Sequence, residues 1–146
     1  MKSVIFVCLG NICRSPIAEG CAKKIVYENN LEIKVDSAGT GDWHVGERPC
    51  ENSIKIAHEN GIDISDLRAR QVRKSDFVEF DLIVVLDDNN YRDLTLMGAK
   101  NIVKLGDFGY DGKDIPDPYF FQGFDGFREV FKMIDICVHN IFKEEI

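Results

Sequence analysis

The sequence lacks an excess of basic residues and has no long apolar run. Its 18 Lys and Arg residues are outnumbered by 25 Asp and Glu residues, which gives a formal net charge of -7. Because proteins that bind nucleic acids rely on a basic surface, this charge argues against a DNA or RNA partner. No stretch approaches the ~18 apolar residues that a membrane span requires, and no signal-peptide core is present. We therefore expect a cytoplasmic protein without a membrane partner.

The chain also lacks the cysteine and histidine patterns of disulfide-rich and metal-binding proteins. Its five cysteines are an odd number, which does not suggest a fixed disulfide framework. The spacing of Cys8, Cys13 and Cys21 is not a usual zinc pattern, and no paired histidines accompany it. We therefore expect no metal site and no cofactor.

Linkers, internal repeats and low-complexity tracts are absent as well. A length of 146 residues with 45% hydrophobic and 29% charged residues is ordinary for a globular protein with one core. We expect residues 1–146 to form a single domain.

The most informative stretch present is Cys8-Leu-Gly-Asn-Ile-Cys-Arg-Ser-Pro16, which follows a short apolar run. It is typical of a strand, a tight polar turn and a helix that opens at Ser15-Pro16. A turn with five residues between Cys8 and Arg14 can direct its backbone N–H groups inward around an anion, and the helix N-terminus adds to the positive field. The Arg14 guanidinium matches phosphate oxygens two at a time. The pattern predicts a Cys8 thiolate aimed at a bound phosphate.

The remaining apolar patterns predict an α/β fold in three layers, with a four-stranded parallel sheet flanked by helices. Strands are expected at 4–7, 31–35, 81–86 and 101–105. Helices are expected at about 15–28, 49–60, 76–79, 90–97 and 124–142. The glycine-rich stretch 36–46 is predicted to be a loop.

A second candidate motif, Asp114-Ile-Pro-Asp-Pro-Tyr-Phe-Phe121, lies near the C-terminus. Pro116 and Pro118 restrict the backbone on either side of Asp117. A rigid segment that presents one carboxylate suits a general acid, although Asp-Pro turns are common and prove nothing alone.

Together the two motifs resemble those of the low-molecular-weight protein tyrosine phosphatases, and the resemblance covers essentially the whole chain. It implies hydrolysis of phosphotyrosine and aryl phosphates through a phosphocysteine at Cys8, with Asp117 as general acid and then base. Arg14 and the backbone of the loop would stabilise the phosphate oxygens. The implied phosphate-binding residues are Leu9, Gly10, Asn11, Ile12, Cys13 and Arg14.

The resemblance also implies supporting roles. Ser15 would donate a hydrogen bond to the Cys8 sulfur, and Asn11 would hold an unusual backbone conformation. Trp43 and Tyr119 would form opposite walls of the substrate cleft, next to Ile12. Ser37 would hydrogen-bond the loop, and Asp87 would position active-site groups or simply cap a helix.

Two further residues bear on regulation and on a departure from the family. Cys13 would form a reversible disulfide with Cys8, which protects the nucleophile, or would merely pack behind the loop. Leu67 stands where the family usually has a histidine that braces the loop. This departure leaves the bracing of Ser15 and Asn11 open.

Three alternative functions follow from the same motifs. An arsenate reductase would need further cysteines near residues 84–89, and the sequence has none there. A phosphoarginine phosphatase tends to carry Thr at the position of Ile12. A non-enzymatic phosphopeptide-binding module would be expected to lose Cys8 or Asp117. We expect phosphotyrosine proteins or peptides and inorganic phosphate or related oxyanions as partners, and a monomer, with weak self-association left open.

Overall fold

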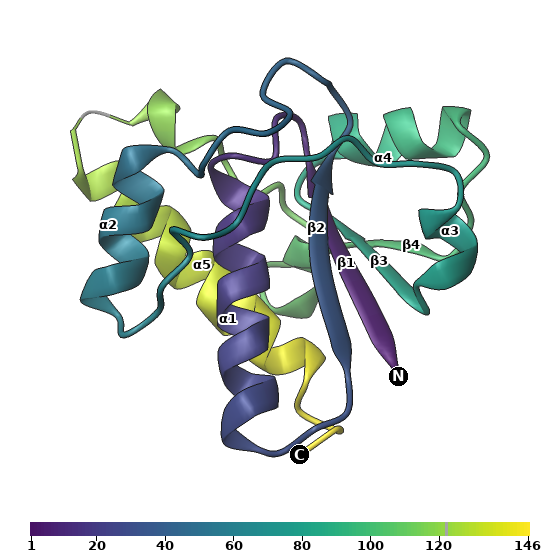
Figure 1. Cartoon of the computed structure of the whole chain (residues 1–146), viewed down its shortest axis with the longest axis horizontal. Helices are drawn as coiled ribbons and strands as arrows, with labels where there is room; N and C mark the ends of the chain where they lie inside the picture. The colour runs from purple at the N-terminus through teal and green to yellow at the C-terminus, as the bar shows by residue number, and fades with distance from the viewer. Residues whose placement is uncertain (122) are drawn as a thin grey trace.

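The computed structural model describes residues 1–121 and 123–146, which form a four-stranded parallel sheet between two layers of helices (Figure 1). The strands are β1 (Ser3–Cys8), β2 (Lys34–Gly39), β3 (Leu82–Val85) and β4 (Ile102–Lys104), in the order β2-β1-β3-β4. The helices are α1 (Arg14–Glu28), α2 (Glu51–Glu59), α3 (Asp76–Glu79), α4 (Asp88–Leu96) and α5 (Asp125–Ile141), with 3-10 turns η1 (Leu105–Phe108) and η2 (Pro118–Phe120). The predicted α/β class and four-stranded parallel sheet are confirmed.

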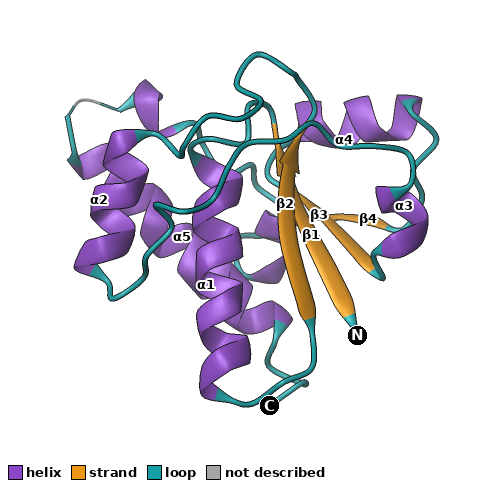
Figure 2. Cartoon of the chain, viewed as in Figure 1, coloured by secondary structure: helices purple, strands orange, loops and turns teal. Residues whose placement is uncertain are grey.

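Two apolar clusters fix the layers. Helices α1 and α5 cover one face of the sheet, with α2 packed against them on the same side, and α3 and α4 lie on the other face (Figure 2). Every residue of β1 is buried: Val4 and Phe6 pack toward the first group of helices, and Ile5 and Val7 toward the second. A central parallel strand covered on both faces has to be apolar throughout, which is why the run before Cys8 has no alternation.

The second strand differs from its prediction. Residues 31–33 are outside it, and β2 instead includes Asp36 to Gly39, which had been assigned to a loop. These residues pair in parallel with β1, ending with Cys8 opposite Gly39. The small residues are required here because a Cβ on Gly39 would lie 2.8 Å from the Leu9 carbonyl oxygen. The small residues at the end of β2 therefore reflect close contact with the loop after β1, and they do not mark a turn.

The carboxyl ends of the strands gather the predicted site residues at one edge of the sheet. Cys8 ends β1, Gly39 ends β2, and Asp87 follows β3. In open α/β sheets this edge is where ligands bind. Among the described residues, no helix combines the length and the apolar character needed to cross a membrane.

Candidate active site

A pocket at this edge brings together residues from both ends of the chain. Its volume is about 230 Å³. It is lined by Cys8, Leu9, Gly10, Ile12, Cys13, Arg14, Trp43, His44, Asp117 and Tyr119. The loop after β1 and the segment around Asp117, far apart in the sequence, therefore face one cavity.

Cys8 lies at the floor of the pocket, with 3% of its surface exposed. Its Sγ atom is 3.0 Å from Ser15 Oγ and accepts a hydrogen bond from the Asn11 backbone N–H at 3.3 Å. Because Asn11 Nδ2 donates to Ser15 Oγ at 2.8 Å, the Ser15 proton remains available for the sulfur. Two donors directed at one sulfur stabilise negative charge on it.

The loop between Cys8 and Arg14 offers further donors to the same pocket. Within residues 1–121 and 123–146, the backbone N–H groups of Leu9, Gly10, Ile12 and Cys13 donate to no protein acceptor. Unpaired N–H groups in succession are the mark of an anion-binding nest. An oxyanion bound above Cys8 would satisfy them.

The loop is braced from behind by a buried polar network. Asn11 has a positive φ of 57°, the unusual conformation expected for it. Its Nδ2 atom also donates to Ser37 Oγ at 2.9 Å, and Ser37 Oγ donates to Glu19 Oε1 at 2.5 Å. The Asn11 Oδ1 atom accepts a hydrogen bond from the Arg70 backbone N–H at 3.1 Å. Both ends of the Asn11 amide are thus fixed, although residue 67 is Leu.

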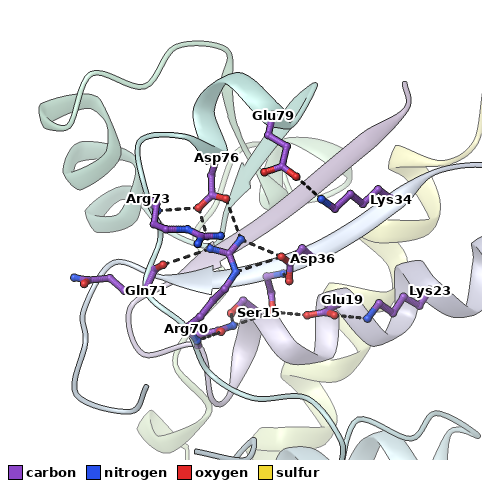
Figure 3. Close-up of polar contacts among 12 residues, drawn as sticks. Ser15, Glu19, Lys23, Lys34, Asp36, Arg70, Gln71, Arg73, Asp76 and Glu79 are labelled. Atoms are coloured by element: carbon purple, nitrogen blue, oxygen red, sulfur yellow. Dashed lines mark hydrogen bonds and ion pairs between the residues drawn. The ribbon is translucent and has the colours of Figure 1, made fainter. Parts of the chain in front are cut away.

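Arg70 supports this network through ion pairs that the sequence pattern did not reveal. Its guanidinium bridges Asp36 on β2 and Asp76 at the start of α3 (Figure 3), with N–O distances of 3.0 Å to each. Burial opposes ionisation of the fully buried Asp76, but hydrogen bonds from the Arg70 side chain and the Arg73 backbone N–H hold its pKa below the usual range. Arg70 therefore ties the loop at 70–72 to β2.

Arg14 is held in place by two acceptors. Its Nη1 atom donates to Asp87 Oδ2 and to the Ile115 carbonyl oxygen, both at 2.8 Å. Asp87 also accepts from the Asn90 backbone N–H at 2.8 Å and so caps α4. Asp87 therefore contacts Arg14 and also caps α4, so its contacts fit both of the roles predicted for it.

The rim of the pocket is more exposed. Asp117 Oδ1 accepts from the Tyr119 backbone N–H at 3.0 Å at the start of η2. Trp43 and Tyr119 are 68% and 62% exposed, and Ile12 is half-buried beside them. The Trp43 ring lies against Gly41, where a Cβ would come within 1.9 Å of it. Both predicted cleft aromatics border the pocket.

The sequence reasoning missed three groups near the site. Glu19 is buried on α1 beneath Ser37, and His44 lines the pocket. Cys50, which follows Pro49 before α2, places its Sγ atom 2.7 Å from Cys13 Sγ. All five thiols are free, so the predicted Cys8–Cys13 disulfide remains a prediction. In the sequence, Pro49-Cys50 indicated only the start of a helix, and nothing there pointed to contact with Cys13.

No group of three or more His, Cys, Asp or Glu side chains is arranged to hold a metal ion in the described part of the chain. The positive groups of the pocket are Arg14 and the backbone N–H groups around it.

The fold and the pocket define an α/β protein in which the loop from Cys8 to Arg14 presents two cysteines, Cys8 and Cys13, and one arginine to the pocket. Comparison with known proteins agrees with this description. Residues 3–145 match the family described as low molecular weight phosphotyrosine protein phosphatase. The chain is 42% identical to the low molecular weight protein-tyrosine-phosphatase YfkJ of Bacillus subtilis, covering 90% of each chain.

Solved structures give the same result. The crystal structure of Primo-1 superposes with a TM-score of 0.90 at 36% identity, covering 99% of this chain and 98% of that one. A Drosophila arginine phosphatase superposes with the same TM-score of 0.90 at 32% identity, again covering 99% and 98%. The chain belongs to the low molecular weight phosphotyrosine protein phosphatase family, and its predicted family, fold class and enzyme class are confirmed.

Proposed function

We propose that residues 1–146 act as a single phosphatase domain that hydrolyses phosphotyrosine in proteins or peptides through a phosphocysteine at Cys8. The observation that carries this proposal is the position of Cys8 Sγ beneath a row of unpaired backbone N–H groups, with Arg14 fixed beside them. A thiol, an anion site and a carboxylate in one pocket are the groups that phosphoryl transfer to cysteine requires.

In the first step, Cys8 Sγ attacks phosphorus and the bond from phosphorus to the phenolic oxygen breaks. Arg14 and the N–H groups of the loop stabilise the three equatorial oxygens. Asp117, which lines the same pocket, gives its proton to the departing phenolate.

In the second step, Asp117 removes a proton from water, which attacks the phosphocysteine and releases inorganic phosphate. The Cys8 thiolate leaves, and the Ser15 hydroxyl at 3.0 Å stabilises its charge. The bracing of Asn11 by Ser37 and Glu19 keeps the donors in place through both steps.

An aryl substrate is supported by the walls of the pocket. Trp43 and Tyr119 offer flat faces for a phenyl ring, and Ile12 offers an apolar contact where a phosphoarginine phosphatase tends to carry Thr. The fold alone does not separate the two substrates, because a Drosophila arginine phosphatase shares it with a TM-score of 0.90. We also propose a monomer in the cytoplasm, where free thiols such as these persist.

The test is hydrolysis of an aryl phosphate under reducing conditions without added metal, with the wild type and Cys8→Ser. We expect turnover by the wild type and none by Cys8→Ser, with circular dichroism reporting the fold of both. Equal turnover, or none in either, contradicts the mechanism. A phosphotyrosine peptide and a phosphoarginine peptide of matched sequence then separate the substrates, and a higher kcat/KM on phosphoarginine overturns the aryl assignment.

A further inference from the structure

Two sulfur atoms outside the proposed reaction lie in contact beside the pocket. Cys13 Sγ donates to Cys50 Sγ at 2.7 Å, within ~1 Å of the length of a disulfide bond, which is about 2.0 Å. Both side chains are half-buried, so a small oxidant or reductant has access to them. Cys13 belongs to the phosphate-binding loop, and Cys50 precedes α2.

The backbone holds this pair together independently of the sulfurs. The Cys50 backbone N–H donates to the Ile12 carbonyl oxygen at 2.7 Å. The buried Ser53 hydroxyl donates to the Cys13 carbonyl oxygen at 3.0 Å and lies 3.0 Å from Cys50 Sγ. These hydrogen bonds join the loop to the start of α2 on both sides of the thiol pair. The contact between the two sulfurs therefore does not depend on the side-chain conformation of one cysteine alone.

The surroundings favour Cys50 as the reactive member. The hydrogen bond from Cys13 has the largest effect on the pKa of Cys50 and lowers it. Burial raises this pKa, and contacts with Ser53 and the Tyr119 side chain lower it further, which leaves it at about 6. The same hydrogen bond raises the pKa of Cys13, because the shared proton stays on that sulfur. The pair thus presents a thiolate at Cys50 next to a protonated thiol at Cys13, the distribution that a thiol–disulfide exchange needs.

We propose that Cys50 is a second resolving thiol, which takes over the disulfide from Cys8 and Cys13 and returns Cys8 to its reduced form. A peroxide first oxidises the Cys8 thiolate to a sulfenic acid and releases hydroxide. Cys13 attacks that sulfur, a Cys8–Cys13 disulfide forms, and the hydroxyl leaves as water with the Cys13 proton. The Cys50 thiolate then attacks Cys13 Sγ, and Cys8 leaves as a thiolate.

The last step has a physical driving force in the pocket. The departing Cys8 thiolate is received by the Ser15 hydroxyl and the Asn11 N–H, which makes it a good leaving group. Two electrons pass overall from Cys13 and Cys50 to the peroxide, which becomes one hydroxide and one water. A dithiol reductant reduces the resulting Cys13–Cys50 disulfide and completes the cycle. The active-site cysteine is then exposed to further oxidation only briefly.

The experiment is disulfide mapping by mass spectrometry after treatment with hydrogen peroxide at pH 7.5. We expect a Cys13–Cys50 disulfide with a free Cys8 in the wild type, and a Cys8–Cys13 disulfide in Cys50→Ser. A wild type that accumulates only Cys8–Cys13 overturns the proposal. Formation of Cys13–Cys50 at the wild-type rate in Cys8→Ser overturns the route through Cys8. Mapping needs no turnover, so its outcome is independent of the proposed phosphatase activity.

Recovery of activity gives a second readout. After peroxide is removed, the wild type is expected to regain activity without added reductant at least tenfold faster than Cys50→Ser, while dithiothreitol restores both. Equal recovery of the two contradicts the proposal. The buried Cys137 of α5 supplies the control, because Cys137→Ala is expected to leave the disulfide pattern unchanged.

The exchange step should also depend on pH in a defined direction. Below about pH 6 the Cys50 thiol is protonated and cannot attack, so the Cys8–Cys13 disulfide should persist longer in acid than at pH 7.5. Ser53→Ala keeps every thiol but removes the hydroxyl that lies 3.0 Å from Cys50 Sγ and donates to the Cys13 carbonyl oxygen, and it should slow the exchange several-fold. A rate that does not change between pH 5 and 7.5 overturns the role of the Cys50 thiolate.

Discussion

The floor and the rim of the active-site pocket are built on opposite principles. The floor consists of buried polar groups: Asn11, Ser15, Glu19 and Ser37 are at most 5% exposed, and hydrogen bonds connect them to one another. The rim consists of the largely exposed Trp43 and Tyr119. Residues at the floor position the sulfur, whereas those at the rim would contact the substrate in the proposed reaction.

This difference follows from the free energy of burying polar groups. A polar atom that is buried without a partner destabilises the fold by ~1–3 kcal/mol, so each member of the floor depends on the others. The rim has no such constraint, because its side chains contact water when no substrate is bound. Substitutions at the floor should therefore change stability and activity together, and substitutions at the rim should change activity alone.

The largest effect is expected for Asp117→Asn. The amide cannot protonate the leaving phenolate, so kcat should fall by ~10²–10⁴, the usual contribution of a general acid. Its oxygen can still accept from the Tyr119 N–H, so the free energy of unfolding should change by less than ~0.5 kcal/mol. Steady-state kinetics and urea denaturation measure the two quantities.

The matched control for this variant is the exposed Asp66, where Asp66→Asn should leave kcat unchanged. The loss at Asp117 should also shrink for aryl phosphates with more acidic phenols, which leave without a proton. A loss that is the same for every phenol contradicts the general-acid role of Asp117.

An intermediate effect is expected for Ser37→Ala, at the floor. The variant leaves Asn11 Nδ2 with one partner fewer and removes the donor to the buried Glu19 carboxylate. We expect a loss of ~1–3 kcal/mol in the free energy of unfolding, together with a fall in kcat of ~10-fold as the loop loses its fixed geometry.

Ser65→Ala serves as the control, because its hydroxyl bonds Asp63 at the surface and its loss should have no measurable effect. If Ser37→Ala changes neither stability nor kcat, the coupling between floor packing and catalysis does not exist.

The smallest effect is expected for Trp43→Ala, at the rim. Loss of aromatic contact with a phosphotyrosine ring should raise KM about five-fold, which corresponds to ~1 kcal/mol, with kcat near the wild-type value. Tyr27→Ala, which removes an aromatic side chain 85% exposed at the far end of α1, should change neither constant. A fall in stability of Trp43→Ala would instead assign that ring a structural role.

Several elements were predictable because their signals are local. The apolar run before Cys8 and the Cys-x5-Arg spacing each lie within a few residues, and the chain forms the expected strand and loop there. At the Pro-Asp-Pro segment Asp117 is extended, and a 3-10 turn begins at Pro118. The bounds of β2 were wrong because its composition reflects a non-local contact: Gly39 is small to admit the Leu9 carbonyl oxygen. A pattern of residues cannot report a neighbour that is distant in sequence.

The sequence by itself determined the chemistry of this protein. The thiol of Cys8, the guanidinium of Arg14 and the carboxylate of Asp117 stand in motifs whose spacing can be interpreted without coordinates. The tertiary structure decided what supports and surrounds them: Glu19 under Ser37, Arg70 between Asp36 and Asp76, and Cys50 against Cys13. The reason is physical, since buried hydrogen bonds and sulfur contacts depend on distances between segments, and folding brings these segments together from separate parts of the chain.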